Sequence, residues 1–135
     1  MSESISKINQ FLSERIDGAK LDMYGAIEIQ RSDHCVINIE ITKDSDVCHL
    51  HANVASFRED EDESILYTAL EMNRFGRPLH NCWLALNSET RMLSLCHNLF
   101  IPLTDSAFFN QTLDNFMRTL AEVKIKLHDQ TELVI

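Results

Sequence analysis

The chain has 135 residues, of which 44% are hydrophobic, and its 21 acidic and 12 basic side chains give a net charge of −9. This length and composition predict one domain, spanning residues 1–135, with a core of normal size. The acidic surface disfavours direct binding of nucleic acid, and the lack of an apolar run near eighteen residues predicts no membrane insertion.

The first predicted element is a helix over residues 2–16. Its apolar side chains recur at helical spacing and line one face: Ile5, Ile8, Phe11, Leu12 and Ile16. Asp17-Gly18 ends the helix, because glycine readily takes the left-handed conformation past the last turn.

Three strands are predicted next, over residues 21–29, 35–42 and 47–55. In the middle strand Ile37, Ile39 and Ile41 alternate with polar residues, which indicates a sheet with one dry face and one wet face. The third strand repeats the pattern, with His49 and His51 on its polar side. The short polar turns between these strands favour an antiparallel meander.

A second helix is predicted over residues 64–75, after five acidic residues at 59–63 that we expect to be solvated. Their charge at a helix N-terminus suits the helix dipole. Apolar side chains occupy more than one face of this helix: Ile65, Leu66, Ala69, Leu70, Met72 and Phe75. Such a helix is either central in the fold or buried by a second subunit.

A hairpin over residues 82–86 and 92–100 and a long helix over residues 105–127 complete the chain. The helix should be roughly 33 Å long, and its predicted core face carries Phe108, Phe109, Leu113, Phe116, Met117, Leu120, Val123 and Leu127. The order helix, three strands, helix, two strands, helix predicts an α+β fold with an antiparallel sheet.

The sequence shows no catalytic constellation, and we predict no catalytic residue, no metal and no cofactor. Cys35, Cys48, Cys82 and Cys96 stand singly in or beside apolar runs, as free thiols would. His49 and His51 would lie about 6.6 Å apart on one strand face. They are interpreted as surface histidines, with a contribution to a zinc site as the alternative.

A cysteine nucleophile is disfavoured as well. Cys96 and His97 are neighbours in a strand, so their side chains diverge, although a pairing with a distant histidine stays open. Trp83 is interpreted as a core residue, with an interface anchor as the alternative. The working part of this protein is therefore expected to be its surface.

The chain resembles a class I type III secretion chaperone of the Tir-chaperone family. The likeness covers the whole element order, the small size and the acidity. Its most specific part is the C-terminal block, which runs through Trp83-Leu84-Ala85-Leu86, Leu93-Ser94-Leu95, Ile101-Pro102-Leu103 and the helix carrying Phe108, Leu113 and Phe116.

The resemblance implies a twisted antiparallel sheet packed by helices, in a homodimer without enzymatic activity. It implies that the protein binds the N-terminal region of a type III secreted effector, in extended form, in the bacterial cytosol. The residues that it implies for effector binding are Ile5, Ile8, Phe11, Leu12, Ile27, Ile29 and Ile39. Those that it implies for the dimer interface are Ile65, Ala69, Leu70, Met72, Phe75 and Trp83.

Physical arguments agree with this interpretation. A second helix with excess apolar surface favours a partner of its own kind, and an incompletely covered sheet can accept an added strand. An N-terminus without a basic start and apolar stretch indicates that the protein stays in the cytosol. Two alternatives remain: a module of the same fold that sequesters a regulator of the secretion system, and a small cysteine- or zinc-dependent enzyme.

Overall fold

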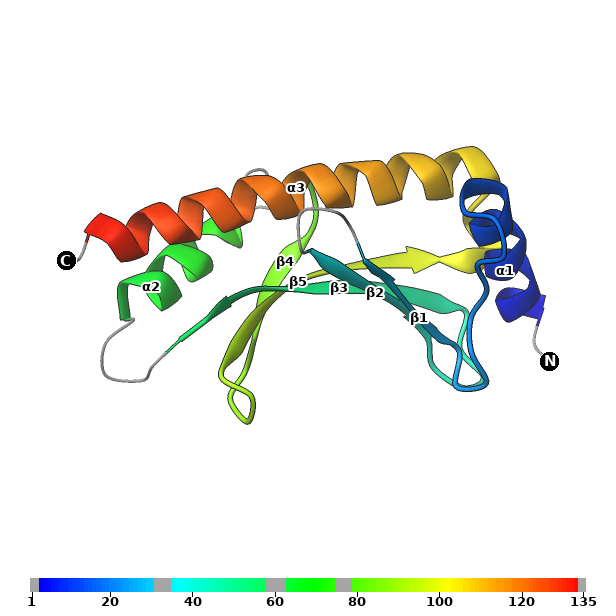
Figure 1. Ribbon diagram of the computed structural model, residues 1–135, viewed down its shortest axis with the longest axis horizontal. Helices are drawn as coiled ribbons and strands as arrows, with labels where there is room; N and C mark the ends of the chain where they lie inside the picture. Colours follow the sequence, from blue (N-terminus) through cyan, green and yellow to red (C-terminus); the bar gives the residue numbers. More distant parts are fainter. Residues whose placement is uncertain (1–2, 31–34, 58–62, 75–78, 134–135) are drawn as a thin grey trace. The chain divides into compact units, whose positions relative to one another are not determined.

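The computed structural model describes residues 3–30, 35–57, 63–74 and 79–133, with side chains up to residue 128. Its elements follow the predicted order (Figure 1): α1 (Glu3–Arg15), β1 (Ala26–Gln30), β2 (Val36–Ile41), β3 (Val47–Ser56), α2 (Glu63–Met72), β4 (Trp83–Asn87), β5 (Met92–Phe100), the 3-10 turn η2 (Ile101–Leu103) and α3 (Ser106–Leu133). The strands form one sheet in the order β1-β2-β3-β5-β4. The predicted α+β class with an antiparallel sheet is confirmed.

The chain divides into two compact units, Met1–His51 with Asn98–Asp114, and Ala52–His97 with Asn115–Ile135. The strands β3 and β5 and the helix α3 each run from one unit into the other. The expectation of a single domain over residues 1–135 stays a prediction.

In the first unit, the isoleucine alternation sets the register of the sheet. Ile39 of β2 lies opposite Ile27 of β1 and Leu50 of β3, so these three side chains share one face. Because side chains alternate along a strand, Glu28, Asn38 and His51 fall on the other face. The first face is covered and the second remains polar, as the sequence predicts.

The helix α1 closes the covered side of this unit. Ile8 and Leu12 have no exposed surface, and the Phe11 ring lies 5.5 Å from that of Phe109 in α3, centroid to centroid. Arg15 donates to Asn110 at 3.1 Å and pairs with Asp114. Apolar packing therefore holds α1 against the first part of α3, and an ion pair at the helix end fixes its orientation.

The segment before β1 is a tight turn, whereas the predicted first strand begins at residue 21. The Asp22 carboxylate accepts hydrogen bonds from the backbone N–H groups of Tyr24 and Ala26, at 2.8 and 3.0 Å. Gly25 then accepts a hydrogen bond from the Ile41 N–H at 2.9 Å. An aspartate that bonds its own downstream amides favours a turn over an extended strand, which explains the difference.

Gly25 and Gly18 make a matched pair for testing this turn. Both have positive φ, +80° and +79°, but a Cβ at Gly25 would lie 2.6 Å from the Ile41 carbonyl oxygen, whereas a Cβ at Gly18 would meet nothing within 4 Å. Gly18→Ala should lower the free energy of unfolding by about 1–2 kcal/mol, which is the cost of holding alanine in the left-handed conformation. Gly25→Ala should cost clearly more, since the backbone must also move. Urea unfolding checks this, and equal losses would contradict the close packing at Gly25.

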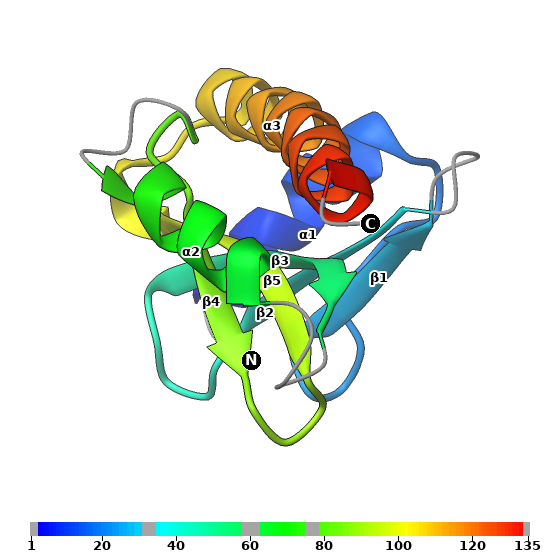
Figure 2. The same cartoon turned by 90° about the vertical axis from the view of Figure 1, so that its left-hand side faces the viewer.

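In the second unit, β4 and β5 pair with Leu84 opposite Leu95. The helix α2 lies beside β4 (Figure 2), and Asn73 just after it holds the strand by two bonds. Its side chain accepts from the Leu84 N–H at 2.7 Å and donates to the Leu84 carbonyl at 3.0 Å. One polar side chain therefore fixes the end of α2 to the middle of β4.

The helix α3 continues to Leu133, beyond the predicted end at residue 127, because no glycine or proline interrupts it. Its buried stripe is narrower than predicted: Phe108 is 50% exposed and Met117 only half-buried, so both assignments to the core face are wrong. The remaining six predicted positions are buried at steps of three and four, which leaves Phe108 one residue off the stripe. Thr119 is buried instead, and its hydroxyl donates to the Asn115 carbonyl at 2.8 Å.

Candidate protein-binding surfaces

An apolar groove runs between α2 and the hairpin in the second unit. It encloses about 160 Å³, and Asn73 is the only polar residue among those that line it: Leu66, Ala69, Leu70, Asn73, Leu84, Leu86 and Leu93. Leu70 is 72% exposed, and Tyr67 and Leu86 are also exposed. Large apolar side chains that gather at a groove are characteristic of a protein-binding surface.

The groove exists because α2 has two apolar faces. One face buries Ile65, Thr68, Ala69 and Met72 within the protein. Leu66, Tyr67 and Leu70 belong to the other face, which keeps solvent-accessible surface. The sequence predicts this double face correctly, and the structure shows which side is already covered.

The residues expected at a dimer interface fall into three groups. Ile65, Ala69 and Met72 are buried, although Ala69 still lines the groove. Leu70 and Trp83 are exposed, so the core interpretation of Trp83 is wrong. Phe75 lies outside the described residues.

The residues expected to bind an effector fall into two groups by their solvent exposure. Ile8, Phe11, Leu12 and Ile39 are buried, and a docked partner could not touch them without opening the core. Ile5, Ile27 and Ile29 are half-buried and keep accessible surface. The four buried side chains therefore support the fold here, and only the other three can contribute directly to a contact.

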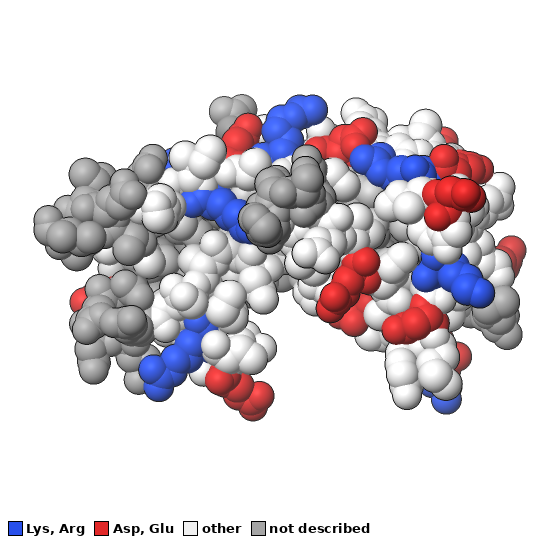
Figure 3. Space-filling view, in the orientation of Figure 1, with Lys and Arg blue, Asp and Glu red and all other residues white. Residues whose placement is uncertain are grey.

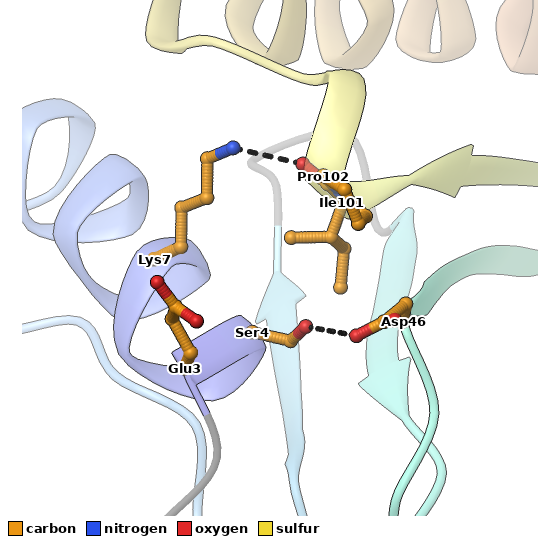
Figure 4. Close-up of a pocket in the computed structure, with 6 residues that line it drawn as sticks. All are labelled: Glu3, Ser4, Lys7, Asp46, Ile101 and Pro102. Carbon is orange, nitrogen blue, oxygen red and sulfur yellow. Dashed lines mark hydrogen bonds between the residues drawn. The ribbon is translucent and has the colours of Figure 1, made fainter.

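A polar hollow of about 350 Å³ lies at the start of α1 (Figure 4). Ser4 donates to the Asp46 carboxylate at 2.8 Å, and the Lys7 ammonium group donates to the Ile101 carbonyl at 2.9 Å across it. These bonds tie α1 to the loop before β3 and to η2. The polar groups of the hollow are thus largely engaged in holding the fold.

Polar side chains form hydrogen bonds on the open face of the sheet in both units. His49 Nδ1 lies 2.8 Å from Asn98 Oδ1, and His51 Nε2 lies 3.0 Å from Glu40 Oε1. Ser94 donates to Asn53 at 2.9 Å in the second unit. Within the described parts of the chain, no three His, Cys, Asp or Glu side chains are grouped closely enough to hold a metal ion.

A second hollow of about 230 Å³ indents this open face in the first unit. Asp22, Glu28, Glu40 and His51 contribute its ionisable groups, and among the described residues no Lys or Arg lines it. Figure 3 shows acidic side chains over β1 and β2 in this region. The hollow is therefore a negatively charged depression beside the outermost strand.

A sequence model of the Tir chaperone protein (CesT) family matches residues 8–124 of the chain. This protein belongs to that family. The match extends from within α1 almost to the end of the described part of α3. It includes the residues that line the groove and the second hollow, whereas Glu3, Ser4 and Lys7 of the first hollow precede it. The resemblance to type III secretion chaperones is confirmed.

Solved structures share the fold of this family member at low identity. A chain of the ExsC–ExsE complex is 18% identical with a TM-score of 0.78, covering 94% of this chain and 97% of that one. A chain of the ExoU–SpcU complex of the Pseudomonas aeruginosa type III secretion system is 14% identical with a TM-score of 0.68, covering 91% and 96%. A chain of the complex of the Yersinia pestis type III secretion chaperone SycH with a fragment of YscM2 is 15% identical with a TM-score of 0.66, covering 89% of this chain and 98% of that one. No curated protein sequence matches significantly.

Three cysteines of this Tir-chaperone family member, Cys48, Cys82 and Cys96, are poorly suited to nucleophilic chemistry. Burial raises the pKa of the Cys48 thiol to about 12, and burial together with nearby Cys96 raises that of Cys82 to about 11. Burial also raises the pKa of Cys96. These three and Cys35 are free thiols. The raised pKa keeps the thiols of Cys48, Cys82 and Cys96 in their unreactive protonated form.

Sequence reasoning missed several exposed apolar side chains. Met23 and Tyr24 project from the Asp22 turn, 87% and 81% exposed, and Leu86 borders the groove. The Asp-x-x-Gly spacing of Asp22 and Gly25 was the available signal for the turn. Among the described residues, no helix is long and apolar enough to cross a membrane.

Proposed function

We propose that this protein is a cytosolic chaperone that binds the N-terminal region of a type III secreted effector in extended form, without enzymatic activity of its own. Family membership supports this function, because the match spans nearly every described element. Two structures of this fold are also complexes: ExoU–SpcU from a type III secretion system, and the type III secretion chaperone SycH with a fragment of YscM2.

The observation that carries the effector-binding mode is the free edge of β1. This strand lies at one end of the sheet, as β4 does at the other, so one edge of its backbone has no neighbouring strand among the described residues. Ile27 and Ile29 on it keep accessible apolar surface. An extended segment can add to such an edge through backbone hydrogen bonds, while the isoleucines contribute apolar contacts.

The α2 groove supports a homodimer. A two-fold interface uses the same patch on both subunits, so Leu70 of one copy can insert into the groove of the other, and the reverse. Such an interface would cover Tyr67, Leu70 and Leu86, which are exposed in the single chain. Trp83 on β4 is a second exposed candidate for this contact.

Purification of the tagged chain from its native host tests the function. We expect one secreted protein to copurify, with its N-terminal segment protected from proteolysis and identified by mass spectrometry. Replacing Ile27 and Ile29 together with Glu should abolish this capture, because carboxylates would oppose apolar packing along β1. Ile125→Glu, at an exposed apolar position of α3, is the matched control and should leave capture intact.

The identity of the captured protein decides the outcome. Capture of a regulator that is not secreted would favour the sequestering module instead. Capture that survives the Ile27 and Ile29 substitutions would contradict binding at β1, and no protected segment at all would contradict the proposed function.

A further inference from the structure

The Asp22 turn presents two apolar side chains on a rigid backbone. Four backbone hydrogen bonds, two of them to the Asp22 carboxylate, close the turn at 2.8 to 3.0 Å: Tyr24 N and Ala26 N to Asp22 Oδ1, Asp22 N to the Ala26 carbonyl, and Gly25 N to the Asp22 carbonyl. Gly25 is buried against the Ile41 backbone at the end of β2, which also holds the turn in place. The backbone that carries the exposed Met23 and Tyr24 side chains is thus ordered before a partner binds, which lowers the entropy cost of binding.

The acidic hollow adjoins this turn, since Asp22 and Ala26 belong to both. Among the described residues, its three carboxylates pair with no Lys or Arg. Glu40 has His51 at 3.0 Å, while Asp22 bonds backbone amides and Glu28 makes no hydrogen bond or ion pair with the described residues. The Glu40 and His51 side chains remain 45% and 36% exposed, so an incoming group can reach them.

The geometry of β1 aligns the hollow with a docked strand. Glu28 lies opposite Asn38, and Ala26 lies opposite Glu40, on the open face. In a segment paired with the free edge of β1, every second side chain would point to that face. One such side chain would then lie over the hollow.

We propose that the segment bound along β1 places an Arg or Lys side chain in the hollow of Asp22, Glu28 and Glu40, with a neighbouring apolar residue against Met23 and Tyr24. This deepens the proposed function and rests on it for the position of the segment. Charge complementarity selects the occupant: a guanidinium or ammonium group satisfies the carboxylates, whereas an acidic or neutral residue leaves them uncompensated. The contact therefore selects among extended partners.

A pair of blocked peptides tests the charge requirement on the full-length chain. Both have the sequence Thr-Val-Thr-X-Thr-Val-Thr, with X either arginine or citrulline, its neutral isostere. Titration followed by ¹H–¹⁵N NMR should show shifts in the amides of residues 22–30. The arginine peptide should bind about fivefold more tightly at low salt, the effect of one partly screened ion pair.

Matched variants locate the effect. Glu28→Gln with Glu40→Gln should remove the preference for arginine, whereas Glu71→Gln with Glu89→Gln, exposed positions in the second unit, should keep it despite the same change in net charge. Equal binding of the two peptides, or a preference that survives the Glu28 and Glu40 substitutions, would overturn the inference.

The native partner separates this inference from the proposed function. If the partner is captured by the wild-type chain and binds the Glu28 and Glu40 variant with unchanged affinity, the inference fails and the chaperone function stands. If no secreted partner is captured but the arginine preference maps to the hollow, the chaperone function fails and the cation-binding surface stands.

Discussion

Replacing Leu70 with Glu is expected to convert the proposed homodimer to a folded monomer. Leu70 is 72% exposed at the edge of the α2 groove, so the substitution should cost the isolated chain little. In the dimer the carboxylate would be buried against leucines with no cationic partner, which is strongly unfavourable. We expect the dimer dissociation constant to rise about 100-fold or more, as for a central interface residue.

Light scattering coupled to size-exclusion chromatography measures this change across micromolar concentrations. Leu103→Glu is the matched control, because Leu103 is 82% exposed and is not among the residues that line the groove. It should leave the dimer intact, and circular dichroism should show both variants folded. A wild-type chain that is monomeric throughout, or a dimer that tolerates glutamate at position 70, would rule out the groove as the interface.

Replacing Phe109 with Ala should cause the largest loss of stability of any single substitution proposed for this chain. Its side chain has no exposed surface and packs on Phe11 between α1 and α3. Removing the ring loses its transfer free energy and leaves a cavity, which together cost about 3–5 kcal/mol. Urea unfolding at one fixed protein concentration measures the loss, since the stability of a dimer depends on concentration.

The adjacent phenylalanine supplies the control. Phe108 is 50% exposed, so Phe108→Ala removes much less buried surface and should cost about 1 kcal/mol. The two variants have the same chemical change one residue apart on the same helix. Similar losses for both would contradict the assignment of Phe109 to the core and Phe108 to the surface.

The fold was largely predictable because its signals are local and periodic. The alternation of Ile37, Ile39 and Ile41 predicts a strand with one covered face, and the buried stripe of α3 repeats at helical spacing. Errors arose where one residue can satisfy two patterns. Phe108 is apolar and next to the buried stripe, so the pattern alone places it in the core. Its N–H donates to the Asp105 carboxylate at 2.8 Å, which marks the start of the helix but does not show which face is buried.

The binding surface was less predictable, because apolar sequence does not distinguish a core residue from an exposed one. Ile8, Phe11, Leu12 and Ile39 have the composition of a docking patch, but the protein itself covers them. Met23 and Tyr24 were missed for the opposite reason, since a single exposed apolar pair leaves no periodic trace. The acidic hollow joins Asp22 to Glu40, which are distant in sequence and meet only through strand register.

By itself, the sequence determined the secondary elements, their order, the acidic surface and the excess of apolar side chains on α2. These features depend only on composition and on residues two to four positions apart in the chain. The tertiary structure alone decided which apolar residues remain accessible and which carboxylates lie together. Burial and charge clustering depend on contacts between segments far apart in the chain, and those contacts exist only once the strands have paired and the helices have packed.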